Sequence, residues 1–283
     1  MSRVLRLCFV LSVSVALLAS PSQAEGLRFI ENKGQWPVEY LYRADLPGGY
    51  LFLKKQSFVY VLYDAQRVAA LHTRQATTSE PNAYQIAAHG VEVTFEGSLS
   101  TARLTAAHQH NTRYAYFVGD DPSKWAGQVA AFGELRYQEL YPGIDLRVYA
   151  FEQTVKYEFV VKPKADASRI RLRYEGANRV QLTPKEQVVV ETSVGAFREG
   201  KPYSFQEIDD QTHEVTSHYV VEENRVRFSL PNDYRHEHTL IIDPELVFSS
   251  YSWSVADNWG HTATYDSEGH LYSGGTVFGR SEE

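Results

Sequence analysis

The chain has 283 residues and carries 28 basic against 35 acidic side chains, which gives a formal net charge of −7. A chain of that sign gains nothing from counterion release on nucleic acid, and no run of basic residues offsets it, so nucleic acid is excluded as a partner. With 19 tyrosines and 14 phenylalanines but a single methionine, the composition favours pleated surfaces and predicts an all-β protein.

Residues 1–24 have the three parts of a secretory signal peptide. Arg3 and Arg6 precede an apolar run over residues 7–18, and small residues stand at 22 and 24, where the signal peptidase reads the chain. That run is too short to span a bilayer, which takes about 20 residues. We therefore expect a secreted protein whose mature chain begins at Glu25 and contains no membrane span.

The single cysteine, Cys8, lies in the predicted signal, so the mature chain has none. Disulfides, thiol nucleophiles and thiolate metal sites are thereby excluded from the mature protein. Removing Arg3 and Arg6 leaves 26 basic against 35 acidic side chains, which makes the net charge −9.

The first part of the mature chain alternates short apolar runs with turn residues. Residues 25–37 are expected to be an extended lead-in, because Asn32, Gly34 and Pro37 interrupt regular structure. The following segments are then expected: a hairpin of residues 50–54 and 58–63, a mobile loop over 68–82, and strands at 91–95 and 112–118. Asp121 before Pro122 predicts one helical turn through Trp125, and no longer helix is expected.

The central stretch, residues 137–161, has the clearest pattern. Pro142-Gly143 predicts a chain reversal, because proline presets φ and glycine tolerates positive φ. Residues 144–149 and 157–161 then alternate apolar and polar side chains, which predicts an antiparallel pair of half-buried strands.

Alternation continues through the remainder of the module. Residues 170–175 alternate most cleanly, with Arg171, Arg173 and Glu175 directed outward. Further strands are predicted at 180–182, 188–192, 203–208, 215–221, 226–230 and 240–242. Many short strands at this spacing predict an antiparallel β-sandwich-like module over residues 25–245.

The amino-acid composition of the sequence changes after Asp243-Pro244. Residues 261–265 and 270–273 flank Asp266-Ser-Glu-Gly269 and are expected to form a hairpin. Since a lone hairpin is marginal in water, we expect residues 246–283 to be the truncated beginning of another β domain.

Several segments together resemble one family of large exported proteins. They are FIENKGQWP (29–37), YFVGDDPSKW (116–125), YQELYPGIDLRVY (137–149), KYEFVVKPKADASRIRLRYEGA (156–177), KPYSFQ (201–206), LIIDPELVFSSY (240–251) and ADNWGHTATYDSEGHLYSGGTVFG (256–279). The chain resembles the N-terminal module, a domain of unknown function, of secreted surface proteins of gliding bacteria. Those proteins end in a gliding-motility-associated C-terminal domain and leave the cell by type 9 secretion.

The resemblance implies a cell-surface or extracellular location in a Gram-negative bacterium, with propeller-type repeats beginning in residues 246–283. It brings no catalytic, cofactor-binding or metal-binding residues that could be carried over. The sequence departs from the family at residues 163–167, where a glycine and a second proline are missing from the turn. It also contains no sorting domain, so surface attachment is implied by kinship alone.

Some acidic residues are candidates for chemistry. Asp145 could be an acid, a base or a ligand, but we favour a structural role, in which it accepts backbone N–H groups at the Pro-Gly corner or pairs with Arg147. Asp145, Glu158 and Asp243 could also supply the two carboxylates of a glycosidase, an alternative that acids on strand faces make weaker.

Histidines and tryptophans are the remaining candidates. His108 with His110, and His236 with His238, have the spacing of metal ligands, but neither pair has an evident third ligand and solvated side chains are favoured. Asp266-Ser-Glu-Gly269 is too short for a calcium loop. Four tryptophans could stack on sugars if exposed in a row, although core packing is favoured for each: Trp36, Trp125, Trp253 and Trp259.

We therefore predict a non-catalytic scaffold or adhesion module without a cofactor, whose partners are surface glycans or other cell-surface proteins. The alternatives are a carbohydrate-binding module and a polysaccharide hydrolase that uses paired carboxylates.

Overall fold

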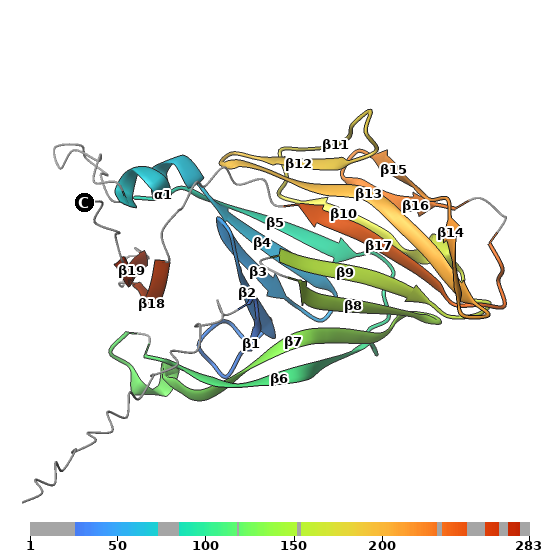
Figure 1. The fold of residues 1–283 in the computed structure, drawn as a ribbon. Coiled ribbons are helices and arrows are strands. Elements are labelled where there is room, and N and C mark those ends of the chain that lie inside the picture. The colour runs from blue at the N-terminus through green and yellow to red at the C-terminus, as the bar shows by residue number, and fades with distance from the viewer. Residues whose placement is uncertain are drawn as a thin grey trace, which may run out of the picture.

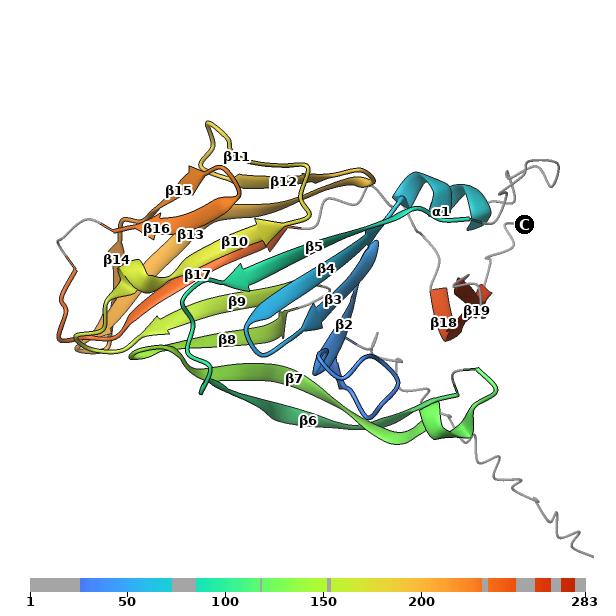
Figure 2. The ribbon, with the colours of Figure 1, turned by 180° about the vertical axis from the view of Figure 1, so that it is seen from behind.

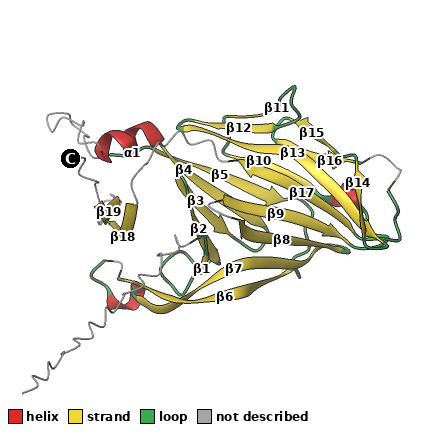
Figure 3. Cartoon of the chain, viewed as in Figure 1, coloured by secondary structure: helices red, strands yellow, loops and turns green. Residues whose placement is uncertain are grey.

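The computed structural model of the chain describes residues 26–72, 85–117, 119–151, 154–230, 234–247, 258–265 and 271–277. Strands dominate these residues, and the helices are short and lie at the margins (Figure 3). The all-β prediction is therefore confirmed. The main sheet has 17 strands, with these bounds: β1 Phe29–Glu31, β2 Tyr42–Leu46, β3 Gly49–Leu53, β4 Ser57–Tyr63, β5 Ala88–Phe95, β6 Arg103–Tyr116, β7 Ala126–Tyr141, β8 Ile144–Phe151, β9 Thr154–Val161, β10 Arg171–Glu175, β11 Arg179–Leu182, β12 Val188–Thr192, β13 Gly195–Ile208, β14 Gln211–Val215, β15 His218–Glu222, β16 Arg225–Ser229 and β17 Leu240–Val247.

All pairings in the main sheet are antiparallel, and they make one long path. The path runs β15-β16-β10-β5-β4-β3-β2-β1 to β7, and from β7 through β8-β9-β17-β13-β12 to β11, while β6 adds to β7 and β14 adds to β13. The two ends, β11 and β15, contact each other, so the sheet is nearly closed (Figure 1). The module predicted as β-sandwich-like is thus one connected sheet with two facing walls, one from β15 to β1 along this path and the other from β8 to β11.

The long strand β7 joins the two walls. Its first half pairs with β1 through Phe132 opposite Phe29, and its second half pairs with β8 through Glu134 opposite Tyr149. Gly133 lies at the change of partner. Because one strand serves both walls, the chain turns the corner without leaving the hydrogen-bonded sheet. Figure 2 shows the β6–β7 ribbon along one side of the molecule and β10 to β16 on the opposite side.

The core lies between the walls and is rich in aromatic side chains. Phe58 on β4 packs against Phe95, Tyr137 and Tyr157, with ring centroids 4.9, 6.1 and 6.1 Å away. All four side chains are at most 3% exposed. Rings at these edge-on distances add attraction beyond the burial of their area, so residues from four separate strands hold the walls together.

Several local predictions are confirmed. Gly143 has φ +73° at the reversal between β7 and β8, and Arg147 lies opposite Glu158 in the β8–β9 pair. Asp121 caps the 3-10 turn Pro122–Lys124 by accepting the Ser123 N–H at 3.0 Å. The predicted C-terminal hairpin is also present as β18 Asn258–Tyr265 and β19 Leu271–Val277, while its turn, residues 266–270, lies outside the described residues.

Two predictions are wrong at residues 68–72, namely that they belong to a loop and that no helix is longer than one turn. The expected loop over residues 68–82 begins inside α1, Ala65–His72, which is longer than a single turn. Asp64 caps this helix, because its Oδ1 accepts the Arg67 N–H at 3.0 Å. Three of its eight residues are alanine, a strong helix former. The sequence analysis missed this helix signal because the segment as a whole is polar. Residues 73–82 lie outside the described part of the chain.

Other strand limits also differ. The single strand expected over residues 215–221 is divided into β14 and β15, and the lead-in contains the strand β1. β6 and β13 begin well before the runs that predicted them. In β6, register shifts against β7 mark bulges that break the simple alternation.

Gly49 gives a test of how closely β3 and β4 approach. A Cβ atom there would lie 2.0 Å from the Val61 carbonyl oxygen, whereas a Cβ at Gly90 on β5 would meet nothing within 4 Å. We expect Gly49→Ala to lower the free energy of unfolding by about 1–3 kcal/mol, because backbone must move apart. Gly90→Ala is the matched control and should be neutral or slightly stabilising in urea unfolding. Equal effects of the two substitutions would contradict this account of the β3–β4 contact.

Candidate functional site

The most unusual side chain of the core is an acid. Glu199 on β13 is only 1% exposed. The Tyr157 hydroxyl of β9 donates to its Oε2 at 2.7 Å, and the Tyr174 hydroxyl of β10 donates to its Oε1. Since β10 belongs to the opposite wall, the carboxyl group of Glu199 links the two walls through the core.

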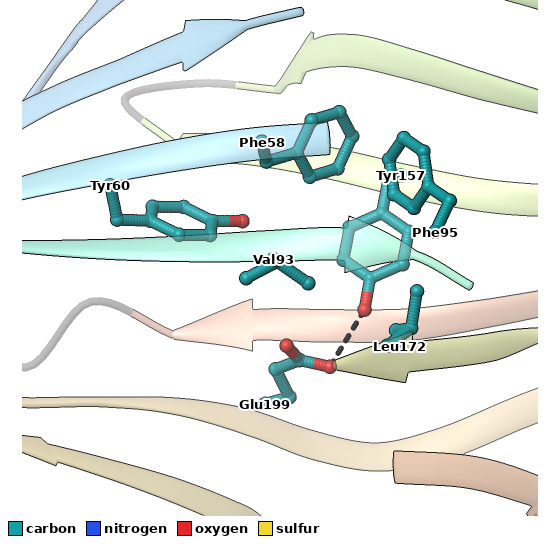
Figure 4. A pocket seen from close by; sticks show the side chains of 7 residues that line it. All are labelled: Phe58, Tyr60, Val93, Phe95, Tyr157, Leu172 and Glu199. Atoms are coloured by element: carbon teal, nitrogen blue, oxygen red, sulfur yellow. Dashed lines mark hydrogen bonds between the residues drawn. The ribbon is translucent and has the colours of Figure 1, made fainter. Parts of the chain in front are cut away.

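The space around Glu199 is closed. Figure 4 shows it between aromatic and aliphatic side chains, together with the hydrogen bond from Tyr157. The lining residues are Phe58, Tyr60, Val93, Phe95, Tyr157, Leu172 and Glu199, and the gap between them is too small for a water molecule. Glu199 therefore has a place in the packing of the core, with no room beside it for a substrate.

Burial and hydrogen bonding act on the ionisation of Glu199 in opposite directions. Burial raises its pKa above the ordinary value, and the hydroxyls of Tyr157, Tyr174 and Tyr219 lower it by a smaller amount. Burial also raises the pKa of each of these tyrosines, so they remain donors. The Tyr219 hydroxyl is buried near the carboxyl group without a well-directed hydrogen-bond partner in the described part of the chain.

The sequence analysis missed Glu199, although a signal was present. Phe197 and Glu199 share the inward side of β13, and both are essentially buried. The strand was predicted only from Tyr203 onward, because Gly200 and Pro202 interrupt the alternation and the register of β13 with β17 shifts between Glu199 and Pro202. The available signal for Glu199 was its position on the inward side of a strand in a protein rich in tyrosine, whose hydroxyls need acceptors.

Asp145 has the structural role that we favoured, with a different cation. Its Oδ1 accepts the backbone N–H of Glu139 at 2.7 Å and the Nζ of Lys162 at 2.9 Å. Lys162 also binds Glu139, whose Oε2 accepts the Gly143 N–H at 3.0 Å. Asp145 thus accepts a backbone N–H beside the Pro-Gly corner, the first of the two structural contacts that we considered, and its cation is Lys162 in place of Arg147.

Arg147 instead joins two other acids. Its guanidinium lies 3.0 Å from Glu158 and 2.7 Å from Glu134, which also binds Arg136. Although burial opposes it, hydrogen bonds from Arg147 and Arg136 lower the pKa of Glu134. Glu158 is therefore neutralised within an ion network on the outer face of β7, β8 and β9.

The proposed acid pair of a hydrolase does not face a cleft. Ile242 lies opposite Phe159, so the register of β17 and β9 places Asp243 next to Glu158 on the outer face. Lys156 lies 3.9 Å from Asp243. Glycoside hydrolysis uses carboxyl groups on either side of the scissile bond, whereas neighbours on one sheet face lie on the same side of any ligand.

The histidines of the two predicted pairs have neighbours other than a metal-ligand set. His108 has φ +56° at the β6 bulge, and its Nε2 lies 3.7 Å from Glu134, while His110 lies beside Gly133. The His236 ring packs on Tyr234 with centroids 4.2 Å apart. Within the described residues there is no group of three or more His, Cys, Asp or Glu side chains that could hold a metal ion.

The described tryptophans differ in exposure. Trp36 packs edge-on against Phe52 and Tyr116, with centroids 5.8 and 5.5 Å away, so its expected packing role is found. Trp125 is 45% exposed and lies against Phe117, which is 63% exposed. This pair makes a small apolar surface at the tip of the β6–β7 ribbon. Trp253 and the Trp259 side chain lie outside the described residues.

A second feature that the sequence analysis missed is an array of four arginines. Arg171 and Arg173 on β10 lie directly opposite Arg227 and Arg225 on β16. The signal was the repeated Arg-X-Arg pattern in two segments far apart in the chain, which only the pairing of the strands brings together. We call these four residues the arginine array.

Fold and site together define an all-β module with a dry aromatic core and a strongly charged outer surface. In the described part of the chain, no helix has both the length and the apolar character needed to cross a membrane. The model of one family, Domain of unknown function (DUF7948), matches residues 29–245, and the chain belongs to this family. No curated protein and no solved structure matches the chain.

Glu199 makes stability depend on pH in a defined direction. Well below the ordinary glutamate pKa, the folded and unfolded chains both hold the proton. As pH rises, the unfolded chain releases it first, so the contribution of Glu199 to stability falls until its raised folded pKa is passed. We expect Glu199→Gln, which keeps an acceptor for the tyrosines, to remove this fall.

The measurement is urea unfolding of both proteins between pH 4 and 8, with the difference in unfolding free energy plotted against pH. Glu199→Leu is the matched control and should unfold more easily at every pH, by about 1–3 kcal/mol for each tyrosine hydroxyl left unsatisfied. A difference between native protein and Glu199→Gln that does not vary with pH would show that Glu199 does not titrate as argued.

Proposed function

We propose that this chain is a non-catalytic interaction module of an exported protein, acting as a scaffold or adhesion element at the cell surface. The observation that carries the proposal is the closed core, where Glu199 has no space beside it for a substrate. Asp145, Glu158 and Asp243 support it, since each lies by a cation on the outside of the sheet. Under this proposal, the outer surface of the sheet makes the contacts with partners.

The proposed cellular location of the protein rests on the signal peptide pattern of residues 1–24 and on the resemblance to secreted surface proteins of gliding bacteria. Under this proposal a Gram-negative cell exports the protein, and the family module is followed by propeller-type repeats beginning in residues 246–283. Surface glycans or other cell-surface proteins are the partners.

A carbohydrate-binding module is the second candidate. The exposed pair Trp125 and Phe117 favours it, because aromatic faces stack on sugar rings. Tyr203, 44% exposed and stacked on Phe205 with centroids 5.4 Å apart, offers another such surface on β13.

The export step predicts a defined new N-terminus. Expressed in a Gram-negative host, the protein should be recovered outside the cytoplasm with Glu25 as its first residue, as read by intact-protein mass spectrometry. Ala24→Lys is the control, because a long charged side chain does not fit the small-residue position that the peptidase reads, and its leader should be retained. Native protein that keeps residues 1–24 would refute the proposed address.

A panel of neutral and acidic polysaccharides separates the functional classes. The purified protein should release no new reducing ends from any of them, since its carboxylates are ion-paired on one face. Release that Asp145→Asn or Glu158→Gln abolishes would overturn the proposal in favour of a hydrolase.

The same panel, read as binding, tests the second candidate. Trp125→Ala should leave glycan binding unchanged if the module is a scaffold. Leu182→Ala, which removes another exposed apolar side chain, is the matched control. Binding lost in Trp125→Ala and kept in Leu182→Ala would establish the carbohydrate-binding module instead.

A further inference from the structure

The arginine array places four positive charges together on the outer face of β10 and β16. Arg171 lies opposite Arg227, and Arg173 lies opposite Arg225. The intervening Leu172 and Val226 are 2% and 1% exposed, so alternation sends all four arginines to the other side of the sheet. In each of these two arginine pairs the Cβ atoms are expected to lie about 5 Å apart, as is usual for directly opposed residues of an antiparallel pair.

Half of the array is neutralised by neighbouring acids. Glu96 lies 3.2 Å from both Arg173 and Arg225 and bridges them. Glu175 adds a second contact to Arg173, also at 3.2 Å. This half is a closed ion network and needs no further partner.

The other half, which we call the open pair, is Arg171 with Arg227. Arg227 lies 3.2 Å from Glu222, whose side chain is 66% exposed. The Arg171 side chain is exposed and makes no ion pair within 4 Å in the described part of the chain. The two arginines thus start from directly opposed positions on the exposed face, and each has an acid on its outer flank, Glu222 beside Arg227 and Asp166 near enough to Arg171 to interact with its charge.

Such an arrangement lowers stability when nothing is bound. Like charges directly opposite each other on neighbouring strands are destabilising. The planar fork of arginine matches the two oxygens of a carboxylate, sulfate or phosphate, and two adjacent forks hold such a group more strongly than one. An anionic ligand would remove the repulsion and form charge-assisted hydrogen bonds.

The surroundings decide which anion fits. Three acids, Glu96, Glu222 and Asp166, surround the open pair, and the whole chain has a net charge of −7, so a continuous phosphate backbone would be repelled on both sides. Ser229 continues the same face of β16 and supplies a neutral hydroxyl. A ligand with separate anionic groups set among hydroxyls suits this pattern.

We propose that the open pair Arg171 and Arg227 binds an anionic group of an acidic glycan, a uronic carboxylate or a sulfate ester. This names the ligand class of the proposed interaction function and rests on that function. No covalent step is involved, and binding should weaken as salt screens the charges.

The test compares two double variants that remove the same charge. Arg171→Gln with Arg227→Gln removes the open pair, and Arg179→Gln with Arg198→Gln removes two exposed arginines from β11 and β13. Titration calorimetry would use the full mature chain with an oligogalacturonate, a sulfated heparin oligosaccharide, neutral dextran and a single-stranded oligonucleotide.

We expect at least one acidic oligosaccharide to bind and dextran not to bind. The open-pair variant should weaken that binding about tenfold or more, the size of a lost charge-assisted hydrogen bond, and the control variant should change it less than about twofold. The melting temperature of the open-pair variant should be equal or higher, because a repulsion is removed. The two acidic probes distinguish a carboxylate from a sulfate as the group bound.

Four results would overturn the assignment. They are no binding of either acidic oligosaccharide, equal losses in both variants, an oligonucleotide affinity equal to that of the glycan, and a clear fall in melting temperature of the open-pair variant, which would make these arginines structural. Acidic glycan that binds equally to both variants would leave the interaction function standing and remove only this site. Release of reducing ends would remove the interaction function itself.

Discussion

The structure depends on closing one sheet around a tightly packed aromatic core. A sheet that nearly meets itself must fill its interior with side chains, and here aromatic rings from β4, β5, β7 and β9 fill it. Tyrosine suits this task only if its hydroxyl finds an acceptor. Glu199 supplies that acceptor to Tyr157 and Tyr174 at once, so one buried carboxyl allows two large polar-tipped rings to be used as packing material.

The same constraint sends most charged groups to the outer surface. Because side chains alternate between the two faces of a strand, the neighbours of an inward apolar residue point outward, where charged groups can meet solvent or each other. On β8, Asp145 and Arg147 are such neighbours: Arg147 binds acids on β7 and β9, and Asp145 binds Lys162 directly after β9. The charged side chains of β7, β8 and β9 are therefore arranged as ion networks on the outside of the sheet.

Apart from the helix α1, the sequence predicted most features that depend on near neighbours. Period-two alternation and the Pro142-Gly143 corner were sufficient for the β8–β9 pair, and Asp121 was sufficient for the 3-10 turn. Features that depend on pairing between distant segments were missed. The arginine array needs β10 beside β16, more than 50 residues later, and Lys162 reaches Asp145 only because β9 returns beside β8. The first half of β6 was also missed, because the bulge at His108, which has positive φ, breaks the alternation of that strand.

Two groups work against stability in this fold, and their surroundings differ. Glu199 is buried at an energetic cost, but two hydroxyls satisfy it and its removal would leave them unpaired, so packing alone explains its presence. Arg171 and Arg227 are like charges at directly opposed surface positions, where either could be replaced by a neutral side chain without leaving a buried group unsatisfied. An unfavourable contact that packing does not require is better explained by a ligand than by the fold, which is why the outer face of β10 and β16 is where binding should be sought.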